Sequence, residues 1–142
     1  MLGVHGVGGS NPPVPTIFLA QREGLIPMDN IKTRKDAADL AAKALKLADL
    51  AQTQPGAIVS REILRKKTGT VTVFAFAAGE ELSEHTAPFD ALVFALEGRA
   101  DVSISGTPHR VTAGEMIIMP ADKPHALKAL KPFKMMLVMV KS

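Results

Sequence analysis

The stretch of sequence that decides the fold is residues 79–98, GEELSEHTAPFDALVFALEG. A second stretch, residues 114–129, reads GEMIIMPADKPHALKA and follows the same plan. Each stretch begins with a glycine suited to a turn and carries an extended apolar run and a single histidine. We therefore interpret the two stretches as successive arms of one β-barrel, which brings His85 and His125 together inside it.

Outward from these stretches, short apolar runs follow one another at nearly even spacing. Glycine or proline turns separate them, as at Gly69, Gly106 and Pro132. Many short strands with such punctuation are typical of an all-β sandwich or barrel. We expect a barrel domain over residues 57–142, with strands near 57–64, 70–77, 91–97, 100–105, 109–112, 116–119, 126–130 and 133–140.

Two of the expected strands are apolar at both odd and even positions, namely residues 92–96 (LVFAL) and 135–139 (MMLVM). An antiparallel strand with one wet face alternates apolar and polar residues, so these strands are expected to be covered on both sides. One cover is the barrel interior. The other is either an N-terminal helix or a second subunit, and a homodimer is therefore expected.

The N-terminal tail, residues 1–30, is rich in glycine and proline and shows neither a helical nor a strand period. Such a segment buries little surface, so we expect it to be disordered or loosely draped over the barrel. One hypothesis is that this tail is no part of the working gene product, because Met28 offers a second translation start. Whether Met1 or Met28 starts the native chain stays open.

Alanine, leucine and charged residues dominate residues 33–51, TRKDAADLAAKALKLADLA. Thr33 and Asp36 form an N-cap signal. Apolar residues then recur near a 3.6-residue period, at Ala37, Leu40, Ala41, Ala44, Leu45 and Ala48. We expect an amphipathic helix that covers the barrel, within a helix and linker region of residues 31–56. A helix that binds a partner is the alternative.

Composition excludes several classes of protein. The chain of 142 residues has the length of one domain, and without cysteine it has no disulfide, thiolate zinc site or cysteine nucleophile. Its formal charge of +3 is spread along the chain, and no aromatic residue interleaves the basic ones, so no nucleic-acid partner is expected. No apolar run approaches the ~20 residues that span a bilayer. We expect a cytoplasmic protein that contacts no membrane.

The two stretches together resemble the motifs of the cupins, a family of small jelly-roll barrels. The first motif is Gly, five residues, His, one residue, His, three or four residues, Glu, six residues and Gly. Gly79, His85 and Gly98 keep their places in this chain. Ala87 stands at the second histidine position and Ala91 at the glutamate position.

The second motif is Gly, five residues, Pro, one residue, Gly, two residues, His, three residues and Asn. Gly114, Pro120 and His125 match it, while Asp122 replaces the glycine and Ala129 the asparagine. The resemblance covers about residues 57–140. It implies a single-domain cupin, that is, a small jelly-roll barrel preceded here by the helix and the tail.

The resemblance also implies a metal site. In the family, the two histidines and the glutamate of the first motif and the histidine of the second commonly hold one ion, often iron, manganese, nickel or zinc. This chain keeps only His85 and His125 of that set. Asp90 is the best substitute for the missing carboxylate. Strict alternation from His85 would point Asp90 outward, but Pro88 interrupts the strand and so removes this constraint. A divalent metal ion on these three side chains is one hypothesis, and a pair of buried, hydrogen-bonded structural histidines is the other.

The parity that points His85 inward also predicts the lining of the barrel. The predicted pocket residues are His85, Ala87, Ala91, Val93, Met116, Ile118 and His125, with Met135 or Met139 as further candidates. Apolar walls with two polar groups are typical of a site for a small ligand, although methionines also fill cores. The sequence thus predicts a module that binds a small apolar or weakly polar molecule. The alternative is a metal-dependent oxygenase or isomerase, and whether the protein is an enzyme stays open.

Overall fold

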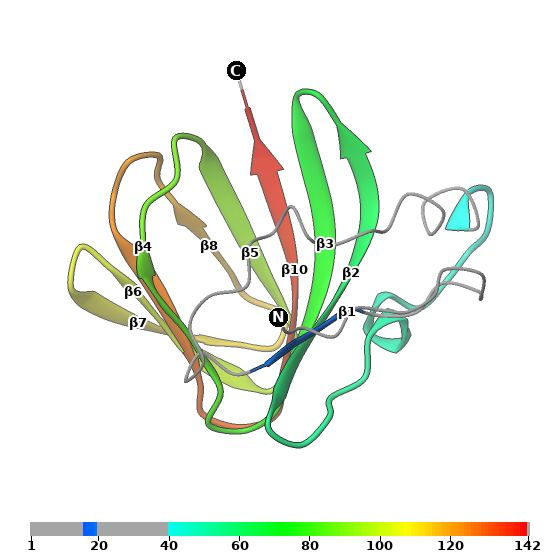
Figure 1. Cartoon of the computed structure of the whole chain (residues 1–142), viewed down its shortest axis with the longest axis horizontal. Coiled ribbons are helices and arrows are strands. Elements are labelled where there is room, and N and C mark those ends of the chain that lie inside the picture. The colour runs from blue at the N-terminus through cyan, green and yellow to red at the C-terminus, as the bar shows by residue number, and fades with distance from the viewer. Residues whose placement is uncertain (1–15, 20–39, 142) are drawn as a thin grey trace.

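Two antiparallel β-sheets lie face to face in the computed structural model, which describes residues 40–141 and the backbone of residues 16–19 (Figure 1). The larger sheet has the strand order β1-β2-β3-β10-β5-β8 and the smaller sheet β4-β9-β6-β7. This architecture confirms the predicted all-β fold. The strands are β1 (Thr16–Leu19), β2 (Ala57–Lys66), β3 (Gly69–Phe76), β4 (Glu81–His85), β5 (Asp90–Glu97), β6 (Arg99–Ile104), β7 (Thr107–Thr112), β8 (Met116–Met119), β9 (His125–Ala129) and β10 (Phe133–Val140).

Gly98 makes the sharp turn between β5 and β6, where the chain passes from the larger sheet to the smaller one. Its φ is +78°, in the left-handed region that favours glycine. A Cβ at this position would overlap the carbonyl oxygen of Pro132, in the connection between β9 and β10. The last glycine of the first motif is therefore required both by its backbone conformation and by this close approach.

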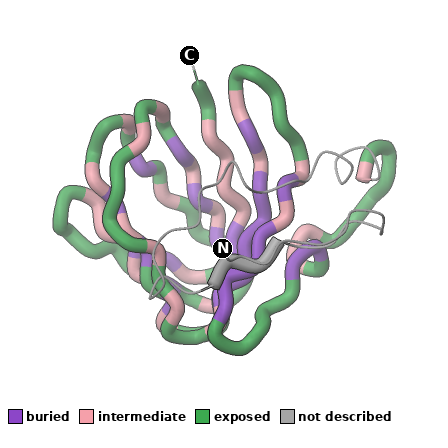
Figure 2. Tube along the Cα trace, viewed as in Figure 1, coloured by how far each residue is buried: buried purple, intermediate pink, exposed green. Residues whose placement is uncertain are grey.

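The hydrophobic core fills the space between the facing sheets. The ring of Phe76 packs against those of Phe74 and Phe133, with centroids 6.1 and 5.8 Å apart. Val93 and Val102 lie in the same cluster and are fully buried. Buried residues (purple) run along the middle strands, and the loops at the strand ends are exposed (green) (Figure 2). The motif stretches thus contribute both to the core and to the loops that border it.

The segment before β2 covers part of the outer face of the larger sheet. A small cluster of fully buried side chains forms there, made of Ala51, Val59, Val73 and Ala75. Lys134 of β10 reaches into the same region, where its Nζ donates a hydrogen bond to the carbonyl oxygen of Ala48 at 2.7 Å. The hydrogen bond and the small apolar contacts together hold this segment on the sheet.

The same segment corrects the C-terminal part of the predicted amphipathic helix. Leu40 is helical and residues 31–39 lie outside the described residues, but from residue 41 to residue 51 the chain forms one 3-10 helix, η3 (Leu47–Leu50), and otherwise turns and irregular backbone. Ala42 takes φ +59°, a left-handed conformation that an α-helix does not continue through. A short alanine-rich helix depends on tertiary packing, and here Lys134 binds the Ala48 carbonyl instead. No helix of the described residues is long and apolar enough to cross a membrane.

Part of the predicted N-terminal tail forms the edge strand β1. It pairs antiparallel with β2, with Thr16 opposite Ser60 and Leu19 opposite Ala57. The other tail residues, 1–15 and 20–30, lie outside the described residues, as do residues 31–39 of the helix and linker region. Residues 16–19 thus correct the prediction of a tail without strands, whereas the predicted disorder of the other tail residues and the start at Met1 or Met28 stay predictions.

Replacing Gly98 with alanine is expected to lower the free energy of unfolding by about 3 kcal/mol or more, because strain at positive φ adds to the overlap with Pro132. Gly106→Ala is the matched control. Gly106 has φ +84° but no atom within 4 Å of an added Cβ, so we expect a loss of only about 1 kcal/mol. Urea unfolding measures both variants, and equal losses would show that the close approach to Pro132 is unimportant.

Candidate functional site

The two motif histidines meet across neighbouring strands. His85 ends β4, His125 begins β9, and the two residues are partners across this antiparallel pair. Their ring centroids lie 4.5 Å apart with the planes at 76°, an edge-to-face arrangement. His125 is 5% exposed, whereas His85 is exposed at the surface. The structure thus places the two imidazoles side by side, as the sequence predicted, but with His85 exposed and not enclosed in the barrel.

A cavity of about 70 Å³ lies beside the histidine pair. Strands of both sheets form its walls, which are apolar apart from the two imidazoles. The lining residues are Leu82, His85, Ala87, Phe89, Ala91, Met119, His125, Ala126, Leu127, Met135, Leu137 and Met139. This cavity is the main candidate for a functional site.

Four of the predicted pocket residues line this cavity, namely His85, Ala87, Ala91 and His125. Met135 and Met139, the further candidates, line it as well. Ala87 and Ala91 occupy the positions where the resemblance implies a histidine and a glutamate. Because both carry only a methyl group, the space that those longer side chains would fill belongs to the cavity.

Three predicted pocket residues lie elsewhere. Val93 is fully buried in the core and does not line the cavity. Met116 and Ile118 are 52% and 50% exposed. The run MIIM of β8 is apolar at every position, so its sequence carries no parity signal. Pairing with β5 decides which residues of β8 face the barrel interior. Met119 lies opposite Ala91, and both residues line the cavity.

Six lining residues were missed by the sequence analysis: Leu82, Phe89, Met119, Ala126, Leu127 and Leu137. For one of them the sequence carried a usable signal. Leu127 lies two positions after His125 in HALKA, and side chains two apart on a strand share a face. Leu82 lies three positions before His85, so strict alternation would place it on the other face, and the irregularity of the β4–β9 register between these two residues brings both to the cavity.

Both imidazoles are oriented by the backbone. The Nδ1 atom of His85 lies 2.7 Å from the carbonyl oxygen of Ser83, and that of His125 lies 3.1 Å from the carbonyl oxygen of Lys123. A carbonyl oxygen only accepts hydrogen bonds, so Nδ1 is the donor in each ring. In the neutral ring, Nε2 is then left with a lone pair that can accept a hydrogen bond or bind a metal ion.

The surroundings of His125 favour this neutral form. Burial lowers the pKa of His125, because a charged imidazolium loses its hydration inside the barrel. The neighbouring His85 lowers the same pKa further, whereas the hydrogen bond to the Lys123 carbonyl raises it. The net effect is a pKa below the ordinary value of 6.5, so His125 is neutral near pH 7.

The side chains present do not fit the metal centre that the resemblance implies. No three of the His, Cys, Asp and Glu side chains in residues 40–141 lie together in a way that could hold a metal ion. Asp90 is exposed and absent from the cavity wall, and its Oδ1 accepts a hydrogen bond from the backbone N–H of Ala121 at 2.8 Å. Two imidazoles without a carboxylate lack a ligand for a catalytic iron or zinc site. We therefore derive no metal-dependent oxygenase or isomerase chemistry from this site.

Comparison with known proteins identifies a matching family model and similar solved structures. A family model of the cupin domain matches residues 72–141. The chain is 34% identical to a conserved protein of unknown function from Streptococcus pyogenes, with a TM-score of 0.69 over 84% of this chain and 97% of that one. No curated protein matches the chain.

Two further solved structures agree with the family model. The chain is 39% identical to a cupin 2 conserved barrel domain protein from Leptotrichia buccalis, over 68% of this chain and 47% of that one, with a TM-score of 0.67. It is 25% identical to a cupin superfamily protein from Desulfitobacterium hafniense, over 71% and 93% of the two chains, with a TM-score of 0.68.

The lowered pKa of His125 predicts how stability depends on pH. The unfolded chain takes up this proton near the ordinary pKa of 6.5, but the folded chain takes it up only at lower pH. Between the two values the unfolded state holds more protons, so the free energy of unfolding falls as the pH drops below about 6.5 and levels off below the folded pKa.

Urea unfolding between about pH 7.5 and pH 5 checks this expectation. His125→Gln is expected to reduce the fall in stability. His109→Gln, which replaces an exposed imidazole on β7, is the control and should retain it. An unchanged pH dependence in His125→Gln would show that another group is responsible.

Proposed function

Because the chain belongs to the cupin family, we propose that its barrel binds a small apolar or weakly polar molecule beside His85 and His125. The cavity is the observation that carries this proposal. Of its twelve lining residues, ten are apolar and two are the imidazoles. Small-ligand sites have this make-up, in which apolar walls provide affinity and a few polar groups provide orientation.

The size of the cavity limits the ligand. A volume of 70 Å³ has room for on the order of five water molecules, at about 15 Å³ each. For comparison, an apolar cavity of about 150 Å³ takes up benzene. We infer that the enclosed part of the ligand has roughly four to six heavy atoms. Any larger part would extend past His85, which is exposed.

The chemistry of the walls favours a neutral ligand. No charged side chain lines the cavity apart from the titratable imidazoles, so an ionised organic molecule would lose its hydration without gaining an ion pair. A neutral imidazole offers the lone pair of Nε2 as a hydrogen-bond acceptor. The best match is therefore a small neutral molecule with an apolar body and one O–H or N–H donor.

Pyrrole and furan test this preference, because the two five-membered rings have nearly the same shape and only pyrrole carries an N–H donor. We expect pyrrole to bind more tightly by roughly two- to tenfold, the value of one neutral hydrogen bond. Titrations followed by NMR shifts of the two imidazole rings measure both affinities. If neither probe shifts these resonances at millimolar concentration, the cavity does not bind such molecules.

Filling the cavity provides the matched test. Ala91→Leu adds three carbon atoms to the wall and is expected to abolish the pyrrole-induced shifts. Ala113→Leu makes the same change at an exposed turn position and should leave them intact. Binding that survives in Ala91→Leu would place the probe outside the cavity.

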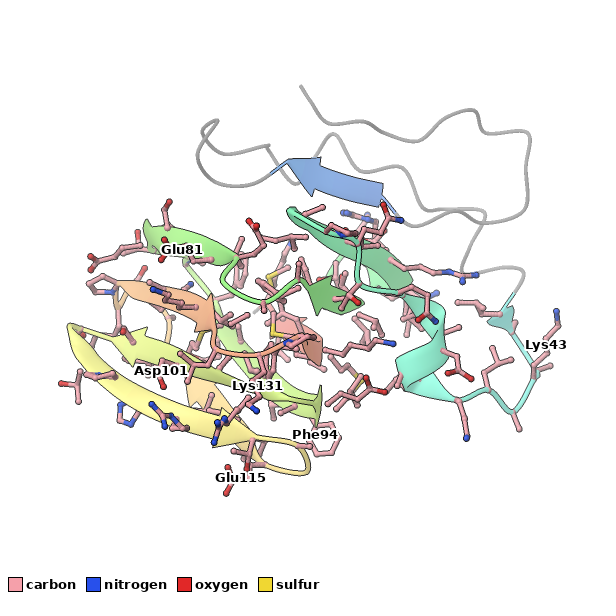
Figure 3. The ribbon with its side chains drawn as sticks, turned by 90° about the horizontal axis from the view of Figure 1, so that it is seen from below. Lys43, Glu81, Phe94, Asp101, Glu115 and Lys131 are labelled. Carbon is pink, nitrogen blue, oxygen red and sulfur yellow. The ribbon has the colours of Figure 1, made fainter. Side chains whose placement is uncertain are left out.

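We also propose that a second copy of the chain covers the outer face of the larger sheet. Phe94 points away from the barrel interior (Figure 3). In the strand register Phe94 lies between Met116 of β8 and Met136 of β10, which form one row of apolar side chains. The neighbouring row on the same face is also apolar and consists of Ile118, Leu92 and Val138. The two rows together form an uncharged apolar face. An uncharged apolar face pairs best with another such face, and a twofold dimer supplies the same one.

Sedimentation velocity tests this proposal. The native chain is expected to be dimeric at micromolar concentration, and Ile118→Lys should yield monomers, because it places a charge within the apolar face. Leu45→Lys is the control, since Leu45 is also about half exposed, at 47%, but belongs to the segment before β2. A monomeric native chain, or equal effects of both variants, would contradict the assigned face.

A further inference from the structure

Three thioether side chains share the cavity with the two imidazoles. Met119, Met135 and Met139 all line it, and they come from β8 and β10 of the larger sheet. His85 and His125 line it from β4 and β9 of the smaller sheet. Histidines thus line this small cavity from one sheet and methionines from the other, and no residue with a carboxylate side chain lines it.

The strand register brings two of the sulfur-bearing side chains close together. Met119 of β8 and Met139 of β10 both lie opposite Ala91, one on each side of it, so the three residues form one row on the inner face. Directly opposed residues have Cβ atoms about 5 Å apart. Because Ala91 carries only a methyl group, both long thioether side chains can extend over it into the cavity.

The imidazoles are oriented in the way that metal-binding histidines are. Metal-binding histidines almost always donate the N–H of the other ring nitrogen to a carboxylate, a carbonyl or water, which fixes the ring and the tautomer. In this chain the Ser83 carbonyl plays that part for His85 and the Lys123 carbonyl for His125. No hydrogen bond among the described residues uses either Nε2 atom, so both are available to an ion.

The type and charge of these donors select the ion. Thioether sulfur is a soft ligand that favours copper(I), and imidazole nitrogen also suits copper. Magnesium, calcium and manganese prefer oxygen ligands, which the cavity wall lacks. Imidazole and thioether groups bind a metal ion in their uncharged form, and a singly charged ion costs less to bury in apolar surroundings than a doubly charged one.

We propose that the cavity is a copper(I) site, in which the Nε2 atoms of His85 and His125 bind the ion together with a thioether sulfur of Met119 or Met139. This ligand set differs from the three histidines and one glutamate that the family resemblance implies, in both the donor atoms and the ion. The inference does not rest on the proposed binding of a small organic molecule, because the two use separate probes.

A competition titration tests the site. The full chain, kept anaerobic with a reductant, is titrated into copper(I) held by a coloured chelator such as bicinchoninate, and the loss of colour reports transfer to the protein. We expect one equivalent of copper(I) to be transferred. If the chelator keeps all of the copper, the proposal is wrong.

Conservative variants identify the ligands. The double variant Met119→Leu and Met139→Leu keeps the shape of the wall but removes two thioethers, and is expected to weaken copper(I) binding at least tenfold. Met116→Leu makes the same change on the outer face of β8 and should leave the affinity unchanged. Equal affinities in the double variant and Met116→Leu would overturn the thioether assignment.

His85→Ala examines the nitrogen side with little risk to folding, because this side chain is exposed. It is also expected to weaken copper(I) binding at least tenfold. Circular dichroism confirms that each variant is folded, and X-ray absorption of the copper-loaded native chain should show both nitrogen and sulfur neighbours. A spectrum with nitrogen and oxygen neighbours alone would exclude the proposed ligand set.

Discussion

The pairing of β4 with β9 is the interaction on which the candidate site depends. It places His85 opposite His125 in the smaller sheet, although the two residues are far apart in the sequence. The bend at Gly98 carries the chain from the larger sheet into the smaller one, so that the two sheets face each other. The wall from the larger sheet then closes the space beside the imidazoles. Loss of this pairing would separate the polar groups from the apolar wall.

The character of the cavity follows from two small side chains. Ala87 and Ala91 lie where longer, metal-binding side chains are usual in the family, and both line the cavity. Their methyl groups leave space and remove negative charge. The wall therefore holds apolar side chains and the two imidazoles but no carboxylate. One pair of small side chains thus accounts for the space beside the histidines and for the absence of a carboxylate there.

The larger sheet carries apolar side chains on both faces, and this shapes the outside of the molecule as well as the inside. Its inner face contributes the phenylalanine cluster and the wall of the cavity. The segment with η3 covers part of its outer face through Ala51 and Lys134. The rows through Phe94 and Leu92 extend beyond that cover. Burial of the remaining apolar face is the physical reason to expect a second copy there.

The sequence alone predicted most of the strands and the turns, because turn glycines and short apolar runs are local signals, but it missed β1 and β4. The spacing of the two motifs predicted that the histidines meet, and alternation around His85 also identified Ala87 and Ala91. The tertiary structure decided what local patterns do not encode. The run MIIM is apolar at every position, so only its pairing with β5 turns Met119 inward and Ile118 outward. Likewise, the alanine-rich segment has a helical period, yet contacts with Lys134 and the sheet decide its conformation.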